Sequence, residues 1–89
     1  MPEISRFLGI VIRMFYNDHS PPHFHAVYGP HEASFCIQTL EVISGGLPAR
    51  VKGLVVEWAS LHQKELQENW KLLTRKDNQS FKKIKPLVE

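Results

Sequence analysis

The chain has 89 residues, of which 43% are hydrophobic, and a formal net charge of +2. This length suits one domain over residues 1–89, with a core just large enough to fold alone. The lone Cys36 excludes a disulfide framework and a cysteine zinc site. No apolar run reaches the ~20 residues of a membrane span, and the first residues lack the layout of a signal peptide. We therefore expect a cytoplasmic protein without membrane contact.

The first half of the chain has the pattern of β-strands. Gly9 to Tyr16 and His23 to Tyr28 are rich in β-branched and aromatic residues, and turn residues bound both segments. Glu32 to Gln38 alternates apolar and polar residues, which predicts a third strand with one apolar face. Thr39 to Ile43 either continues this strand after a bend or forms a short fourth strand, and Ser44-Gly45-Gly46 ends the β half.

The second half has the spacing of amphipathic helices. Pro48 stands at an early helical position, and apolar residues recur at helical intervals to about Thr74. They form a first stripe and a continuation: Val51, Leu54, Val55 and Trp58, then Leu61, Leu66, Trp70 and Leu73. The segment is either one long helix or two helices with a break near Ser60–His62. The tail has three apolar anchors that we expect to dock on the body: Phe81, Ile84 and Leu87.

Strands followed by helices predict an α+β fold. We expect a small antiparallel sheet of three to four strands over residues 9–43, with a helical half over residues 48–74 packed on one face. The first apolar stripe then packs on the apolar face of the third strand, formed by Ala33, Phe35 and Ile37.

The segment between the first two strands holds most of the chemically active side chains. Asn17-Asp18-His19-Ser20-Pro21-Pro22-His23-Phe24-His25 contains three of the five histidines beside an aspartate. Two prolines in series fix two φ angles and stiffen this segment. Imidazole and carboxylate groups carry protons and bind metals near neutral pH. The candidate catalytic residues here are Asp18, His19, His23 and His25.

Because side chains alternate along a strand, His23 and His25 project from the same face. We expect at least one of them within hydrogen-bond or water-bridged reach of Asp18 or His19. One interpretation is a divalent transition-metal site at His23 and His25, completed by Asp18, His19 or His62. A second is an acid–base or phosphate-contacting site, and a third is a purely structural brace. No cofactor is expected other than the metal ion of the first interpretation.

Three polar side chains interrupt the apolar stripe of the helical half. A continuous helix would turn His62, Glu65 and Asn69 toward the sheet, where they are costly unless satisfied. One interpretation is that they face a cleft, with His62 as a catalytic candidate and Glu65 and Asn69 as binding candidates. The alternative is that the helix breaks or shifts phase near Leu61, so that the later apolar residues become the buried set.

The basic residues concentrate in the second half of the chain, where residues 46–89 contain nine Lys or Arg and five Asp or Glu. Such a basic end attracts RNA, DNA or an acidic protein partner, or simply follows the preference of cations for a helix C-terminus. If the chain binds RNA, Arg13 or a cation of the basic end holds phosphate. The cations of that end are Arg75, Lys76, Lys82, Lys83 and Lys85.

Several short motifs together resemble a small bacterial family. They are Pro2-Glu3-Ile4-Ser5-Arg6-Phe7 before Gly9-Ile10-Val11-Ile12, Asn17-Asp18-His19 with Pro21-Pro22-His23-Phe24-His25, Leu40-Glu41-Val42, Glu57-Trp58, His62, Glu65-Leu66 and Asn69-Trp70. Over nearly its whole length the chain is similar to domain-of-unknown-function family 4160. The resemblance implies a bacterial cytoplasmic protein with a small antitoxin-like partner of domain-of-unknown-function family 2442, encoded by a neighbouring gene. In such pairs this family is the proposed toxin, and the resemblance implies no catalytic residues.

Three functions remain open at this point. The chain is a toxin-like protein that cleaves RNA with acid–base groups of the histidine segment, because cleavage beside a 2′-hydroxyl needs only such groups and phosphate contacts. Alternatively, it is a non-enzymatic module that binds protein or nucleic acid. The third function is a metal-dependent hydrolase or metal sensor that uses His23 and His25.

Overall fold

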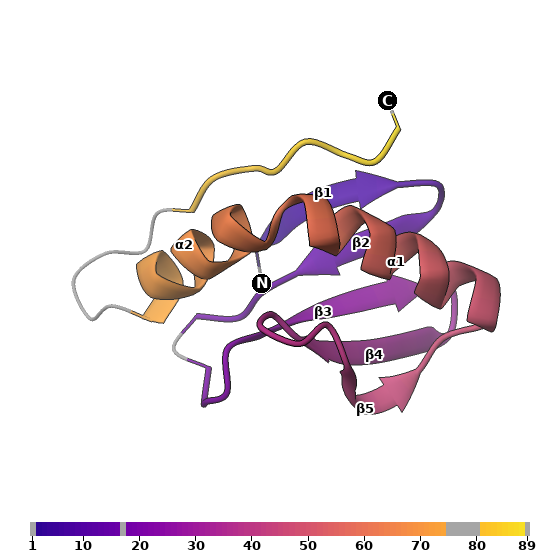
Figure 1. Ribbon diagram of the computed structural model, residues 1–89, viewed down its shortest axis with the longest axis horizontal. Coiled ribbons are helices and arrows are strands. Elements are labelled where there is room, and N and C mark those ends of the chain that lie inside the picture. The colour runs from indigo at the N-terminus through magenta and orange to yellow at the C-terminus, as the bar shows by residue number, and fades with distance from the viewer. Residues whose placement is uncertain (1, 17, 75–80, 89) are drawn as a thin grey trace.

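A computed structural model describes residues 2–16, 18–74 and 81–88 and shows a β-sheet with two helices across one face (Figure 1). The described strands form one antiparallel sheet in the order β1-β2-β3-β4-β5. The elements are β1 (Glu3–Phe7), β2 (Ile10–Arg13), β3 (His23–Tyr28), β4 (His31–Cys36), β5 (Val42–Gly46), α1 (Ala49–Leu61) and α2 (Gln63–Thr74). The predicted α+β class is confirmed, although the sheet has five strands rather than three to four.

The strand that the sequence pattern does not show is β1. A two-residue turn joins it to β2, and both turn residues, Leu8 and Gly9, have positive φ angles of 50° and 80°. This backbone matches the right-handed twist of a tight hairpin, but Leu-Gly is not the usual sequence signature of such a turn. A bulge between Glu3 and Ser5 also breaks the apolar alternation on which strand prediction depends.

The end of the predicted β half also needs correction. Ser44-Gly45-Gly46 ends the β half as predicted, but the sheet extends past residue 43, because this segment forms most of β5, which begins only at Val42. Gly45 has a φ of 73°, and a side chain there would overlap the backbone carbonyl of Glu32. Only glycine therefore allows β5 to lie this close to β4, and the resulting pairing places Ser44 opposite Ser34.

The helical half consists of two helices separated at His62. This residue has φ −130° and ψ 22°, and its N–H donates to the Ala59 carbonyl rather than continuing the α-helical pattern. The interpretation as one continuous helix is therefore wrong, and the phase shift makes Leu66, Trp70 and Leu73 part of the buried set. In the described ranges no helix is both long and apolar enough to cross a membrane.

The core lies between the helices and the sheet, as predicted from the first apolar stripe. Trp58 is fully buried, and its ring lies 5.5 Å from that of Phe7 and 6.0 Å from that of Phe24. Phe24 in turn stacks on Phe35 of β4 at 5.3 Å. The same core cluster contains the predicted apolar face of the third strand: Ala33, Phe35 and Ile37.

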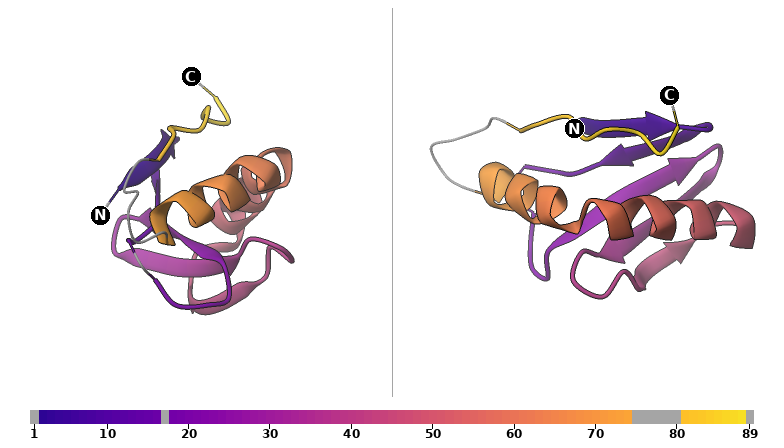
Figure 2. Two further views of the ribbon diagram at one scale, coloured as in Figure 1. Left: turned by 90° about the vertical axis from the view of Figure 1, so that its left-hand side faces the viewer. Right: turned by 45° about the horizontal axis from the view of Figure 1, so that its top comes forward.

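The C-terminal segment, residues 81–88, runs beside β1 (Figure 2). The Ile84 N–H donates to the Ile4 carbonyl at 2.8 Å, and the Trp58 indole N–H donates to the Lys85 carbonyl at 2.9 Å. The buried Asn69 amide bonds both the carbonyl and the N–H of Lys82, at 2.8 and 2.9 Å. The predicted docking of the tail is confirmed, and β1 therefore has neighbours on both sides.

The burial of Trp58 predicts a large loss of stability when its ring is removed. Trp58→Ala should lower the free energy of unfolding by about 3–5 kcal/mol, because it leaves a cavity beside Phe7 and Phe24. Urea unfolding measures this change. Leu61→Ala is the control, since Leu61 on the same helix is 67% exposed and should change the free energy by less than about 1 kcal/mol. Equal losses for both variants would contradict this packing.

Candidate functional site

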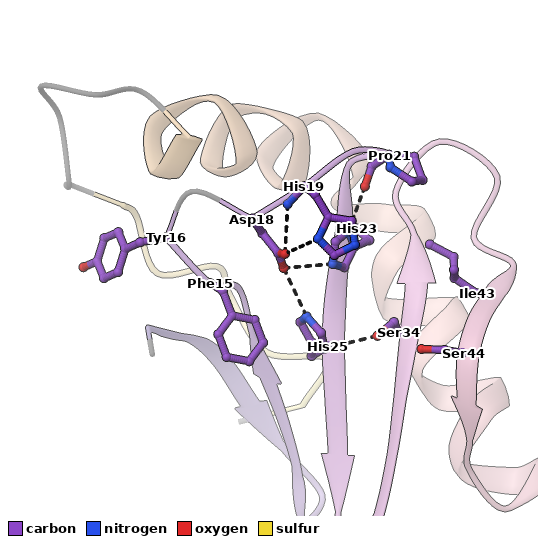
Figure 3. Close-up of a pocket in the computed structure, with 10 residues that line it drawn as sticks. All are labelled: Phe15, Tyr16, Asp18, His19, Pro21, His23, His25, Ser34, Ile43 and Ser44. Carbon is purple, nitrogen blue, oxygen red and sulfur yellow. Dashed lines mark hydrogen bonds and ion pairs between the residues drawn. The ribbon is translucent and has the colours of Figure 1, made fainter.

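The site lies at the start of β3, where the β2–β3 connection meets the sheet (Figure 3). Phe24 and Ala26 of β3 face the core, so the alternating His23 and His25 project from the other face. The two imidazole rings lie 5.1 Å apart, as expected for side chains on the same face of a strand. Strand pairing sets His25 between Arg13 of β2 and Ser34 of β4.

Asp18 brings three histidines together. Its Oδ2 lies 2.9 Å from Nε2 of His23 and 3.5 Å from Nε2 of His25. Its Oδ1 lies 3.0 Å from Nδ1 of His19. The predicted contact between the strand histidines and Asp18 is therefore confirmed. Asp18, His23 and His25 each offer one ligand atom to a common point, and these atoms lie within 4.8 Å of one another.

Nδ1 of each strand histidine has a hydrogen-bond partner of its own. Nδ1 of His23 donates to the Pro21 carbonyl at 2.7 Å, since a carbonyl can only accept. Nδ1 of His25 lies 3.1 Å from the Ser34 hydroxyl. With Nδ1 protonated, a neutral imidazole presents a lone pair at Nε2. Among the described atoms Nε2 of His25 is buried without a hydrogen-bond partner, and that of His23 meets only a carboxylate oxygen.

This arrangement places negative charge and lone pairs around one point. Partial burial pushes the pKa of Asp18 up, but the His19 backbone N–H, the charge of His23 and the polar contact with the His25 side chain outweigh it and hold that pKa below its ordinary value. The carboxyl is therefore ionised at neutral pH. A carboxylate 2.9 Å from an imidazole lone pair is unfavourable unless a proton or a metal cation lies between them.

The cluster opens into a pocket of about 440 Å³. Phe15 and Tyr16 of the β2–β3 connection stand on one side, and Ile43 and Ser44 of β5 stand on the other (Figure 3). The edge of the Phe15 ring meets the His25 ring at 4.4 Å and restricts how that imidazole can turn. The Asp18, His23 and His25 side chains are only 15%, 7% and 14% exposed, so the ligand atoms lie at the bottom of the pocket.

Of the other candidate residues, His19 lines this pocket, whereas His62 and Asn69 have contacts elsewhere. His19 lines the pocket with an 88% exposed side chain. His62 instead bonds Glu65 through Nδ1 at 2.6 Å and packs near Trp58 on the helical layer. Asn69 holds the C-terminal segment, as described above.

The basic candidates are also separate from the pocket lining. Arg13 is the β2 neighbour of His25 in the sheet, but it does not line the pocket, and its buried Nε has no partner among the described residues. Arg75 and Lys76 lie outside the described residues. Lys82, Lys83 and Lys85 are exposed on the C-terminal segment.

The sequence pattern did not identify the site residues that come from β4 and β5, which lie apart from the histidine segment along the chain. Ser34 and Ser44 enter the pocket because β4 and β5 pair in register, and Glu32 reaches His25 Nδ1 at 3.5 Å. The alternation that turns Ala33 and Phe35 inward also turns Ser34 outward, so the sequence pattern predicts the orientation of Ser34. It does not predict that Ser34 pairs with His25, because that pairing depends on the β3–β4 register.

The comparisons with known proteins place the chain in a family of unknown function. The family model described as Domain of unknown function (DUF4160) matches residues 9–71, which are 63 of the 89 residues, and the chain therefore belongs to this family. The match includes the whole Asp18–His25 segment. No curated protein and no solved structure matches the chain.

The lowered pKa of Asp18 predicts how stability depends on pH. The folded state favours the ionised carboxyl, so this stabilisation is present above the unfolded-state pKa and is lost as pH falls through the lower folded-state pKa. Urea unfolding of the wild type and Asp18→Asn should therefore converge as pH falls from about 6 to about 3. A difference between the two proteins that stays constant or widens on acidification would contradict this assignment.

Proposed function

We propose that this member of the DUF4160 family binds one divalent transition metal ion through Asp18, His23 and His25 and uses it to hydrolyse RNA. The observation that carries the metal site is the convergence of one carboxylate oxygen and two imidazole Nε2 atoms within 4.8 Å. The buried Nε2 of His25, which has no hydrogen-bond partner in the described part of the chain, supports the same assignment, because metal coordination satisfies such an atom. The RNA substrate is a separate step, which rests on the toxin-like resemblance.

The donor set suits a catalytic rather than a closed structural metal site. Two imidazoles and one carboxylate bind zinc or iron and leave coordination positions for water and substrate. A zinc ion held in this way lowers the pKa of its bound water to about 7, which supplies hydroxide at neutral pH. The pocket above the ligand atoms gives a substrate access to these positions.

The residues around the ligands have separate roles in this proposal. Pro21 and Ser34 orient the two imidazoles, and Asp18 supplies the negative charge that favours a cation. His19, which is 88% exposed beside Asp18 Oδ1, moves a proton between the pocket and the solvent in this proposal.

A second function uses the same residues without a metal. Asp18 contacts His23 with one oxygen and His19 with the other, at 2.9 and 3.0 Å. This joins two imidazoles through one carboxylate, and such a pair can remove one proton and donate another when RNA is cleaved beside a 2′-hydroxyl. A chelator separates the two functions, because it abolishes only the metal-dependent cleavage.

The biological setting of the proposal is a toxin-like component in the bacterial cytoplasm, neutralised by a small antitoxin-like partner of domain-of-unknown-function family 2442. The resemblance supports this pairing. The exposed lysines of the C-terminal segment, Lys82, Lys83 and Lys85, give either RNA or an acidic partner an attractive surface.

Metal binding is tested on protein purified without an affinity tag. Titration with zinc should show one site, and Asp18→Asn and His25→Ala should each lower the affinity at least about a hundredfold, because each removes one of three ligands. His31→Ala is the control, since His31 is exposed at the start of β4 and lies outside the cluster. Absence of a site in the wild type, or an equal loss in the His31 variant, would refute the metal site.

The RNA function is tested by growth on induced expression and by cleavage of RNA with the purified protein. His25→Ala should relieve growth inhibition and abolish cleavage while the protein remains folded. His62→Ala should keep both activities, because His62 lies with Glu65 and not in the pocket. His23→Ala is less informative, since His23 is buried 5.3 Å from the Trp70 ring and its loss also disturbs packing.

The controls separate the three functions. Cleavage that EDTA abolishes and zinc restores supports the metal-dependent reaction, and cleavage that EDTA leaves unchanged supports the acid–base reaction. If the purified protein cleaves no RNA while the His25 variant still inhibits growth, the chain acts by binding alone.

A further inference from the structure

Ser34 of β4 contacts His25, whose buried Nε2 has no hydrogen-bond partner among the described residues. Its hydroxyl lies 3.1 Å from Nδ1 of His25, and the two residues are direct cross-strand partners in the β3–β4 pairing. We propose that Ser34, together with the Glu32 carboxylate, is the positioning residue that keeps the His25 proton on Nδ1 and so makes Nε2 a metal ligand. This inference rests on the proposed metal site and assigns to Ser34 and Glu32 a role in the affinity of that site.

His25 has two competing partners for its single ring proton. The Asp18 carboxylate lies 3.5 Å from Nε2 and attracts the proton to that nitrogen. A proton on Nε2 occupies the lone pair that a metal ion needs. The ligand role of His25 therefore requires a stronger acceptor system at Nδ1, on the opposite side of the ring.

Ser34 and Glu32 form that acceptor system. A serine hydroxyl can donate or accept, so on its own it does not decide which nitrogen holds the proton. The Glu32 carboxylate lies 3.5 Å from the same Nδ1 and, when ionised, can only accept. Asp18 and Glu32 lie at the same 3.5 Å from opposite nitrogens of the ring, so the closer Ser34 hydroxyl, 3.1 Å from Nδ1, adds the acceptor that favours a proton on Nδ1.

The surroundings leave His25 few alternatives. Its side chain is only 14% exposed, and the Phe15 ring meets it edge-on at 4.4 Å. Water therefore has limited access to replace the serine, and the ring has limited room to flip. His23 differs, because its Nδ1 acceptor is the Pro21 backbone carbonyl, which a side-chain substitution does not remove. The hydroxyl contact of Ser34 with His25 can therefore be removed by a substitution, and its role can be tested directly.

The test measures zinc affinity and, in metal-free protein, the protonated nitrogen of His25 by nitrogen-15 NMR of the imidazole. Ser34→Ala should lower zinc affinity about ten- to a hundredfold, the usual effect of removing a hydrogen-bond partner of a metal-bound histidine. It should also shift the His25 proton from Nδ1 toward Nε2. Ser34→Thr keeps the hydroxyl and should restore both properties, and Glu32→Gln should give a smaller change in the same directions.

Ser44→Ala is the matched control, because Ser44 faces Ser34 from β5 and lines the same pocket without a contact to His25 among the described hydrogen bonds. It should leave both readouts unchanged.

The role of Ser34 is overturned if Ser34→Ala binds zinc as the wild type does, or if its His25 proton stays on Nδ1. If the wild type binds no zinc, the proposed function fails, whereas the NMR measurement still decides whether Ser34 and Glu32 fix the His25 proton. If Ser34→Ala does not fold, Glu32→Gln decides, since Glu32 is exposed and its loss spares the core.

Discussion

The register between β3 and β4 is the constraint on which both the core and the candidate site depend. It sets Phe24 against Phe35 on the inner face and His25 against Ser34 on the outer face. Because side chains alternate with a period of two, a slip of one residue would expose the phenylalanines and bury the imidazole. Hydrophobic packing under Trp58 therefore also fixes the partner of His25, so the stability of the core and the geometry of the site are coupled.

The cluster is held from outside by Pro21 and Ser34, and its three possible ligand atoms lie within 4.8 Å of one another. Pro21 and Ser34 occupy the outer nitrogens of His23 and His25, while the inner nitrogens face the Asp18 carboxylate. A purely structural brace would be expected to pair these inner atoms with donors and acceptors of the protein. The buried Nε2 of His25 has no hydrogen bond among the described residues, although Asp18 Oδ2 lies 3.5 Å away, and the proposed cation would satisfy this nitrogen.

Much of the fold could be predicted because local pattern and tertiary packing agree. The limits of β3, the stripe around Trp58 and the pairing of His23 and His25 on one face all follow from periodicity. β1 could not be predicted, because its bulge breaks the alternation and its Leu8-Gly9 turn adopts positive φ angles without the usual signature. The supports of the site were also missed, since Ser34 and Glu32 come near His25 only through strand register. The same reasoning placed His62 and Asn69 as site candidates, whereas the helix break and the C-terminal segment use them elsewhere.

X-ray absorption of the zinc-loaded, untagged protein tests the central claim most directly, because it reports the atoms bound to the metal. The account predicts one zinc ion per chain with two imidazole ligands and oxygen ligands at about 2.0–2.2 Å. Zinc bound with one imidazole or none, or with sulfur from Cys36, would contradict the assignment of Asp18, His23 and His25 as the metal site.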